Sequence, residues 1–419
     1  MYIATDLLLN IHFYNKECYM YSYNTTDSIC ILDEVEAFFL NSIIKESNYE
    51  RLLEKINIEA EIFDKELTRQ TIDKILKNLS DIFYLSDKYV DLGERIKVSG
   101  ELNQKYPYSI ELCLTNACNH KCIHCYKGIP DKCTKLDFGE ITELLEFIKG
   151  KTRYIQLTGG DPFLYPNFTK LINTYWEDFS FTITTSGYIL NESILDALAK
   201  VGMVQISLYS QKKELHDDFT RLDGSFEKIM RNIRLMQSRG IHVTLSSLVT
   251  PKNIINMEDF VIFCIEQNIP TLTMGSIAEL GNAVGTEGMI LSEQDLIVVR
   301  AKLKELSSKY SSEISIEPWD DFNCPENCDD LFTCQAGRLK WHIHESGRIT
   351  PCALFESEIF NLGSIYNKDY ISLIMNLSRI DSIEALWIKR KSMINDYYSQ
   401  INIDFSKICN KFNSKILIE

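Results

Sequence analysis

The chain has 419 residues, of which 45% are hydrophobic, so two or three globular domains with ample core material are expected. Its formal net charge of −15 argues against nucleic acid as the main partner. No apolar run reaches the about 18 residues that a membrane span needs, and the first residues lack the basic start of a signal peptide. The composition therefore predicts a cytoplasmic protein that acts neither on nucleic acid nor in a membrane.

Residues 1–97 are expected to form a small domain of their own. Alternating apolar and polar residues over 4–32 predict a hairpin and a short third strand. After Asp33, apolar residues at helical spacing predict three helices. Residues 83–86 are predicted to form a strand that completes the domain. Three strands followed by three helices are typical of a small winged-helix-like fold.

Residues 105–310 change to a regular alternation of strands and helices, which predicts an α/β fold with a parallel sheet. Six strand–helix units are two short of a closed barrel, so a partial (β/α)6 barrel is expected. In barrels of this kind the chemistry gathers at the carboxyl ends of the strands. The expected strands are 109–115, 154–158, 181–185, 204–209, 242–249 and 271–275.

The strongest functional signal follows the first of these strands, where Cys118, Cys122 and Cys125 form a C-x3-C-x2-C stretch. Thiolates are the usual ligands of iron–sulfur clusters. Because most clusters take four protein thiolates, three would leave one iron of a [4Fe–4S] cube open to a small ligand. A structural zinc site is the alternative, with His120 or His124 as a fourth ligand.

This stretch resembles the cluster loop of the radical S-adenosylmethionine (SAM) enzymes. The resemblance implies a [4Fe–4S] cluster whose open iron chelates SAM. It implies that one electron cleaves SAM into methionine and a 5′-deoxyadenosyl radical, which abstracts a hydrogen atom from a C–H bond. It also implies an electron donor such as flavodoxin or ferredoxin.

Other strand ends resemble the SAM-binding positions of the same family. The Gly-Gly-Asp-Pro turn that ends in Pro162 stands where the family has Gly-Gly-Glu-Pro, and its aspartate is shorter than the usual glutamate. The simpler alternatives are turn glycines, core hydroxyls and a surface ion pair. The positions that the resemblance implies as SAM contacts are Gly159, Gly160, Asp161, Ser186, Ser207 and Arg221.

Residues 311–419 hold a second group of cysteines. A short motif that starts at Cys334 and another that ends at Cys352 resemble parts of the auxiliary-cluster extension called SPASM. The shortened form of this extension is called Twitch. The dense downstream cysteine series of a full SPASM domain is absent, so one auxiliary iron–sulfur cluster is expected, unless it has been lost. The cysteines expected to complete its ligand set are Cys324 or Cys328, and Cys409.

The domain order as a whole resembles that of radical SAM enzymes that mature ribosomally made precursor peptides. The N-terminal unit is similar to their PqqD-like element, which binds the leader part of the precursor. The resemblance is strongest to sactipeptide-type enzymes, which form a thioether between a cysteine sulfur and an α-carbon. Alternatives are a carbon–carbon or carbon–oxygen crosslink, epimerisation, formylglycine formation, or a non-catalytic leader-binding scaffold with a redox cluster. No residue stands out as a general acid or base.

Overall fold

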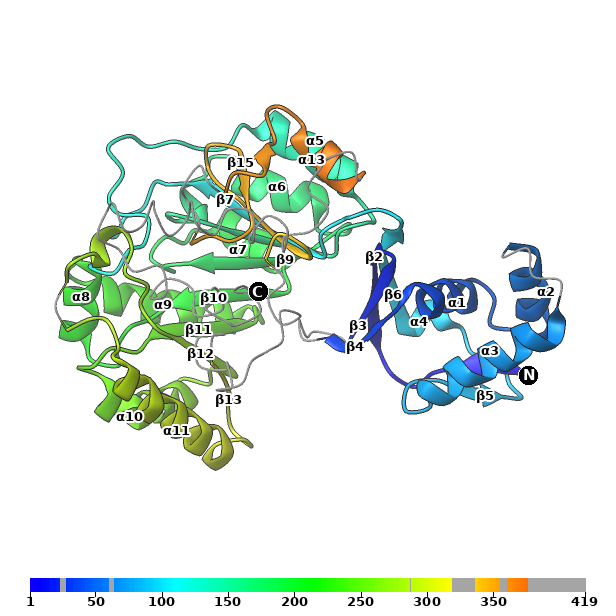
Figure 1. Cartoon of the computed structure of the whole chain (residues 1–419). Coiled ribbons are helices and arrows are strands. Elements are labelled where there is room, and N and C mark those ends of the chain that lie inside the picture. Colours follow the sequence, from blue (N-terminus) through cyan, green and yellow to red (C-terminus); the bar gives the residue numbers. More distant parts are fainter. Residues whose placement is uncertain (23–27, 60–63, 287, 319–335, 355–359, 376–419) are drawn as a thin grey trace. The chain divides into compact units, whose positions relative to one another are not determined.

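The chain divides into two compact units, each described here by itself (Figure 1). Among the described residues, unit 1 comprises those within 1–108 together with 150–153 and 373–375, and unit 2 comprises the others. No helix in the described parts is long and apolar enough to cross a membrane. The structure is a computed structural model that describes residues 1–22, 28–59, 64–286, 288–318, 336–354 and 360–375.

Unit 1 contains a four-stranded sheet of order β4-β3-β2-β6, with helices beside it. The predicted hairpin is confirmed as β2 and β3, which turn at Asn15 with a left-handed backbone (φ 54°). Strand β6 pairs in parallel with β2 and was not predicted. The elements are β1 Tyr2–Ala4, β2 Leu9–Asn15, β3 Glu17–Ser22, β4 Ser28–Leu32, α1 Glu34–Lys45, α2 Tyr49–Glu59, α3 Lys65–Asn78, β5 Tyr84–Ser86, α4 Leu92–Arg95 and β6 Ile96–Leu102.

Helix α1 begins where the sequence predicted it, because Asp33 caps its first turn. The Asp33 side chain accepts hydrogen bonds from the backbone of Val35 and Glu36, and the Glu36 side chain returns to the Asp33 backbone. This reciprocal capping box satisfies amide groups that a helix end otherwise leaves without partners. One face of the helix, including Leu40 and Ile43, is fully buried in the core of the unit.

His12 is a buried polar side chain at the centre of this sheet, with no exposed surface. Its Nε2 lies 2.8 Å from the carbonyl oxygen of Tyr106, which can only accept, so Nε2 carries the proton. Its Nδ1, 3.0 Å from the hydroxyl of Ser99, is then the acceptor. Burial lowers the pKa of His12 to about 4, against the opposing effect of the Tyr106 carbonyl.

We expect unit 1 to lose stability as the pH falls from about 6.5 to about 4. In that window the unfolded chain binds a proton at His12 that the folded chain excludes, which costs up to about 3 kcal/mol. Amide hydrogen exchange of β2 as a function of pH measures the loss. The variant His12→Asn serves as the comparison, since its exchange should depend less on pH in this range. An equal pH dependence in both proteins would rule out His12 as the cause.

Unit 2 is built on a sheet of order β13-β12-β11-β10-β9-β8-β7-β14-β15-β16. The six predicted strands are confirmed as β7 to β12, and a further parallel strand flanks them at each edge, β13 beside β12 and β14 beside β7. The predicted hairpin of the tail is β14 and β15, which turn at Gly347 (φ 80°). The strands are β7 Ser109–Thr115, β8 Tyr154–Gly159, β9 Ser180–Thr185, β10 Met203–Ser207, β11 Val243–Leu248, β12 Thr271–Gly275, β13 Ser315–Pro318, β14 Lys340–Ile343, β15 Arg348–Thr350 and β16 Gly363–Ser364.

Helices connect the parallel strands, as expected for a right-handed α/β arrangement (Figure 1). Helix α8 was not predicted, because its sequence is polar along most of its length. The helices are α5 Phe138–Ile148, η1 Pro162–Leu164, α6 Phe168–Tyr175, α7 Glu192–Leu198, α8 Lys213–Thr220, α9 Ser225–Ser238, η2 Ile254–Asn256, α10 Met257–Glu266, η3 Gly281–Ala283, α11 Glu293–Lys309 and α13 Asp369–Ile374.

The two faces of this sheet differ in chemistry. Side chains alternate between faces along a strand, and one face carries buried leucines and isoleucines of β7 to β9. On the other, which we call the polar face, Gln156 donates to the hydroxyl of Thr184 (2.9 Å) and Gln205 to that of Thr273 (3.3 Å). Buried parallel sheets are usually apolar on both faces, so the polar face is where a polar ligand is expected.

Candidate functional site

The three predicted cluster cysteines lie on one loop, Cys118–Cys125, which follows β7. We call it the cysteine loop. The last residues of α8 hold one side of it through the main chain. Lys121 N–H donates to the Thr220 carbonyl, and Ile123 N–H donates to the Phe219 carbonyl, both at 3.1 Å. The unpredicted helix α8 therefore has a direct role in shaping the loop.

The turn η3 holds the other side of the cysteine loop. Asn282 donates its backbone N–H to the Cys125 carbonyl (2.9 Å) and its side-chain amide to the Cys122 carbonyl (2.8 Å). Gly281 has a left-handed backbone (φ 54°), and a Cβ there would lie only 2.3 Å from the carbonyl oxygens of Cys125 and Tyr126. The glycine is thus required by the close approach of two chain segments.

The two predicted glycines after β8 form a third contact with the start of this loop. Gly160 N–H donates to the Thr115 carbonyl (2.6 Å), and Asp161 N–H donates to the Ala117 carbonyl (2.8 Å). A Cβ on Gly159 would lie 2.2 Å from the Thr115 oxygen, and one on Gly160 would lie 2.3 Å from the Ala117 oxygen. The sequence interpretation assigned both glycines to ligand binding. Their close approach to the backbone of Thr115 and Ala117, just before Cys118, already explains why both positions are glycine.

The three thiols lie close enough together to affect one another. Burial raises the pKa of Cys122, and the neighbouring Cys118 and Cys125 raise it further. No three acidic, histidine or cysteine side chains within the described ranges converge on a position for a single metal ion. In a cubane cluster, however, each thiolate ligates a different iron, so its sulfurs surround the cluster and need not converge. The spacing of the thiols on one loop therefore fits a cluster better than a zinc ion.

Asp161 is fully buried and joins the end of β8 to the end of β9. Its carboxylate accepts hydrogen bonds from the backbone N–H of Phe163 (3.0 Å), the hydroxyl of Thr185 (3.0 Å) and both the hydroxyl and backbone N–H of Ser186. Burial raises the pKa of Asp161, although these hydrogen bonds act in the opposite direction. Asp161 and Ser186, which the resemblance implied as SAM contacts, thus already contact each other.

Ser207 and Arg221 lie on either side of the loop that follows β10. Ser207 is the last residue of β10 and pairs in register with Ser246 of β11. Arg221 ends α8 with a left-handed backbone (φ 54°) and makes no ion pair with any residue that the structure describes. The Asp217 carboxylate accepts from the backbone N–H groups of Gly224 and Phe226, both at 2.8 Å, and so fixes the turn that carries Arg221.

A hydrogen-bonded chain of buried side chains connects β10 to the cysteine loop. His216 Nδ1 accepts from the backbone N–H of Tyr209 (3.3 Å), so a neutral His216 carries its proton on Nε2. That nitrogen lies 3.3 Å from the Ser225 hydroxyl, which lies 2.9 Å from Nε2 of His120. The hydroxyl therefore donates to His120, and a neutral His120 carries its proton on Nδ1. The spacing of these residues in the sequence did not predict this series of hydrogen bonds.

A largely buried ion pair connects the segment just after the cysteine loop to the turn between β14 and β15. Lys127 Nζ lies 2.8 Å from Glu345 Oε2, and the Cys113 thiol donates to the same oxygen (3.1 Å). In the same hairpin, the Thr350 hydroxyl donates to the carbonyl of Cys352 (3.1 Å). Cys352 is the predicted auxiliary ligand within the described residues. The other four predicted auxiliary ligands lie outside the described residues: Cys324, Cys328, Cys334 and Cys409.

Lys127→Met is expected to lower the free energy of unfolding by about 3 kcal/mol at pH 7, because it leaves the Glu345 carboxylate buried without its ammonium. Burial acts to raise the pKa of Glu345, but Lys127 outweighs it and holds that pKa below its usual value. This stabilisation is present above the unfolded pKa of about 4.3 and is lost as the pH falls through the folded value. Denaturant unfolding at several pH values should show the deficit of the variant shrinking below about pH 5.

The exposed pair of Lys368 and Glu143 provides the matched control. Both side chains are about half exposed, so solvent screens the pair and Lys368→Met should leave the stability close to that of the wild type. Equal losses in the two methionine variants would contradict a special role for the buried pair.

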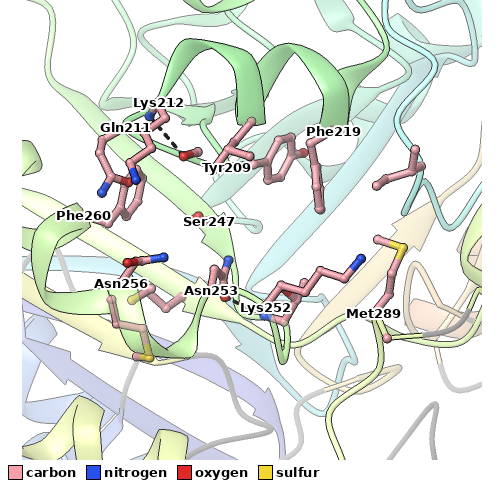
Figure 2. A pocket seen from close by; sticks show the side chains of 17 residues that line it. Tyr209, Gln211, Lys212, Phe219, Ser247, Lys252, Asn253, Asn256, Phe260 and Met289 are labelled. Carbon is pink, nitrogen blue, oxygen red and sulfur yellow. Dashed lines mark hydrogen bonds between the residues drawn. The ribbon is translucent and has the colours of Figure 1, made fainter.

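A cavity of about 230 Å³ opens beside the cysteine loop, between α8 and α10. Figure 2 shows Tyr209 and Phe219 on one side of it, and Lys252 and Asn253 on the opposite side. We call it the α8–α10 pocket. Its walls are formed by Ile123, Tyr209, Ser210, Gln211, Lys212, Leu215, Phe219, Ser247, Thr250, Lys252, Asn253, Asn256, Met257, Phe260, Met274, Gly288 and Met289.

Comparison with known families identifies the segment that holds most of these features. Residues 112–264 match the radical SAM superfamily. The chain carries a radical SAM domain. The matching segment begins within β7 and ends within α10, so it contains the cysteine loop and every position implied as a SAM contact. Radical SAM domains use a [4Fe–4S] cluster together with SAM, and the cysteine loop offers the thiols to hold that cluster.

Two curated relatives from Bacillus subtilis (strain 168) extend the similarity beyond the radical SAM domain. The sporulation killing factor maturation protein SkfB is 26% identical over 273 residues, which cover 63% of this chain and 64% of SkfB. The antilisterial bacteriocin subtilosin biosynthesis protein AlbA is 23% identical over 334 residues, which cover 76% of this chain and 71% of AlbA. The chain thus matches just under two thirds of the length of SkfB.

Among solved structures, Streptococcus suis SuiB has the same fold over most of its length. SuiB bound to S-adenosylmethionine gives a TM-score of 0.64 at 17% identity, covering 89% of this chain and 88% of SuiB. SuiB bound to its precursor peptide SuiA gives a TM-score of 0.63 with the same coverage. These likenesses confirm the predicted fold class, an α/β radical SAM fold with a partial barrel.

Proposed function

We propose that this chain is a radical SAM enzyme that matures a ribosomally synthesised peptide in the cytoplasm. In this proposal it joins a cysteine sulfur of the peptide to an α-carbon of another residue. The observation that carries the proposal is the cysteine loop, which main-chain contacts hold at the carboxyl ends of the strands. The similarity to SkfB, a maturation protein, to AlbA, a bacteriocin biosynthesis protein, and to SuiB, which binds a precursor peptide, supports peptide maturation.

The residues of the radical SAM domain would have the following roles. Cys118, Cys122 and Cys125 hold the cluster, and Asn282 together with the end of α8 fixes their loop. When bound, the cluster and SAM supply a 5′-deoxyadenosyl radical. Arg221 lies exposed on a rigid turn without a carboxylate partner among the described residues, which suits a guanidinium that pairs with the carboxylate of SAM. The amide and hydroxyl groups of the polar face orient the polar ligand.

Unit 1 supports leader-peptide recognition through its sheet. The sheet ends in β4 on one side and β6 on the other, and β6 donates Gly100 N–H to the Lys151 carbonyl (2.7 Å). In the described part of the chain no strand pairs with the outer edge of β4. We infer that the leader adds a strand at β4 through main-chain hydrogen bonds, a mode of recognition that needs few specific side chains.

The test is to incubate the anaerobically reconstituted protein with SAM, dithionite and a cysteine-containing precursor peptide. The expected products are 5′-deoxyadenosine and a peptide that has lost two hydrogen atoms, one from carbon and one from sulfur. The modified cysteine should no longer react with iodoacetamide, which separates a thioether from a carbon–carbon or carbon–oxygen crosslink. Epimerisation would leave the peptide mass unchanged. Cluster absorbance without 5′-deoxyadenosine would instead favour the non-catalytic scaffold.

A further inference from the structure

A glutamate and a histidine form a pair at the edge of the polar face, where β14 joins the sheet. Glu111 of β7 lies between Ile110 and Leu112, which are fully buried on the apolar face. Its side chain therefore lies on the polar face, in register with Gln156 of β8. His342 of β14 pairs in register with Glu111, and its Nδ1 lies 3.3 Å from Glu111 Oε1. The β14–β15 hairpin thus adds an imidazole to the polar face.

The Glu111 carboxylate determines which nitrogen of this imidazole carries the proton. Lys340 Nζ lies 3.6 Å from the other carboxylate oxygen, Glu111 Oε2. Burial acts to raise the pKa of Glu111, but His342 and Lys340 outweigh it and lower that pKa to about 2. A charged carboxylate only accepts hydrogen bonds. A neutral His342 therefore has its proton on Nδ1, beside Glu111, and its lone pair on Nε2.

The second nitrogen of His342 is buried without a partner. His342 is 1% exposed, and its Nε2 has no hydrogen-bond partner among the residues that the structure describes. Most buried polar atoms are paired, because an unpaired one costs free energy. A buried imidazole that a carboxylate orients, with its lone pair free, has the arrangement that a general base needs.

A second histidine on the same face is engaged differently. The ring of His344 lies 4.5 Å from that of His342. The Thr350 hydroxyl donates to the carbonyl of Cys352, so its oxygen accepts from His344 Nε2 at 2.9 Å. Burial lowers the pKa of His344 to about 2, with nearby positive charges as the smaller cause. His344 Nε2 is therefore a donor. The other charged side chains around the two rings are Glu111, Lys127, Lys340, Glu345 and Arg348.

We propose that His342 is the general base that accepts the thiol proton of the peptide's cysteine, with Glu111 as its positioning residue. The inference rests on the proposed function, since a carbon–sulfur bond forms only if the S–H bond breaks. The proton of that bond passes to His342 Nε2, and its electron pair stays on sulfur. The hydrogen of the α-carbon leaves separately, as an atom, to the deoxyadenosyl radical. Bond formation between sulfur and the carbon radical releases one electron, which passes to an oxidised iron–sulfur cluster.

The test compares the reconstituted full-length wild type with His342→Gln, using the cysteine-containing precursor peptide that tests the proposed function. At pH 7 the variant should form the thioether about 100-fold more slowly. It should still form 5′-deoxyadenosine, because hydrogen abstraction from carbon needs no base. The deficit should shrink as the pH rises to about 8.5, where a cysteine thiol ionises without help. Glu111→Gln keeps the imidazole but not its orientation, so it should show a smaller loss of thioether formation.

Nitrogen-15 NMR of histidine-labelled protein gives a readout that does not depend on turnover. In the wild type at pH 8 the His342 signals, assigned by their loss in His342→Gln, should show an unprotonated Nε2. In Glu111→Gln they should show a mixture of the two tautomers, because no carboxylate then selects Nδ1–H. The control His242→Gln makes the same change at an exposed histidine just before β11 and should match the wild type in every measurement.

Three results would overturn the role of His342. One is a protonated Nε2 in the wild type at pH 8. Another is a His342→Gln variant that forms the thioether at the wild-type rate. The third is a variant whose thioether and 5′-deoxyadenosine yields fall together at every pH, since the pair would then only hold β14 against β7. A wild type that makes 5′-deoxyadenosine but no thioether would instead contradict the proposed function, and the assignment of His342 with it.

Discussion

Cys122→Ala is expected to abolish 5′-deoxyadenosine formation. The radical SAM domain has three thiols on its cysteine loop, and the family's cluster leaves only one of its four irons without a protein ligand. Removing the central thiol leaves two ligands, which should not retain the cluster. Iron and sulfide counting under anaerobic conditions, together with chromatography of the SAM cleavage products, measures both losses.

Cys133→Ala is the matched control, because Cys133 is an exposed thiol a few residues beyond the cysteine loop. It should keep its iron content and its activity. In the triple variant lacking Cys118, Cys122 and Cys125, any iron that remains must be held elsewhere, which would support the auxiliary cluster at Cys352. Zinc in the purified wild type, or full activity of Cys122→Ala, would refute the cluster assignment.

Asp161→Asn is expected to destabilise the radical SAM domain strongly. The carboxylate is fully buried and accepts hydrogen bonds from Phe163, Thr185 and Ser186. An amide of the same shape presents N–H groups toward donors and leaves at least one of them unsatisfied. The loss in unfolding free energy should reach about 3 kcal/mol. Denaturant unfolding measures it, and the backbone amides of Phe163 and Ser186 should exchange faster.

The exposed Asp259 in the first turn of α10 provides the comparison for this change. Asp259→Asn should alter stability by about 0.5 kcal/mol or less. If the two variants unfold at the same denaturant concentration, the Asp161 carboxylate does not join β8 to β9 as the hydrogen bonds indicate.

The strands of the partial barrel could be predicted because short strand-like segments alternate regularly with helical ones along this part of the sequence. Strands β7 and β12 have the predicted bounds. Strand β6 could not be predicted, because Gly100 and the exposed Val98 break the alternation on which strand prediction depends. Its stability comes instead from pairing with β2, more than eighty positions earlier in the chain.

The three cluster cysteines could be predicted because their spacing is local. The residues that support their loop could not, because those contacts join distant positions. Asn282 lies 160 positions from Cys122, Ser225 lies 105 positions from His120, and Glu345 lies 218 positions from Lys127. An asparagine, a serine or a glutamate carries no sign of its partner in a single sequence. The resemblance supplied candidate SAM contacts, but it did not reveal that Asp161 and Ser186 contact each other.

The clamping of the cysteine loop by main-chain groups has a consequence for its tolerance of change. Backbone amides and carbonyls are the same for nearly every amino acid, so these hydrogen bonds do not require particular side chains at Asn119, Lys121 and Ile123, three of the five residues between the cysteines. Substitution at these three positions should therefore be mild, whereas inserting or deleting one residue between Cys118 and Cys125 would shift the Cys122 and Cys125 carbonyls out of register with Asn282. In this segment the number of residues between the cysteines matters more than the identity of Asn119, Lys121 and Ile123, whereas His120 also contributes its side chain through Ser225.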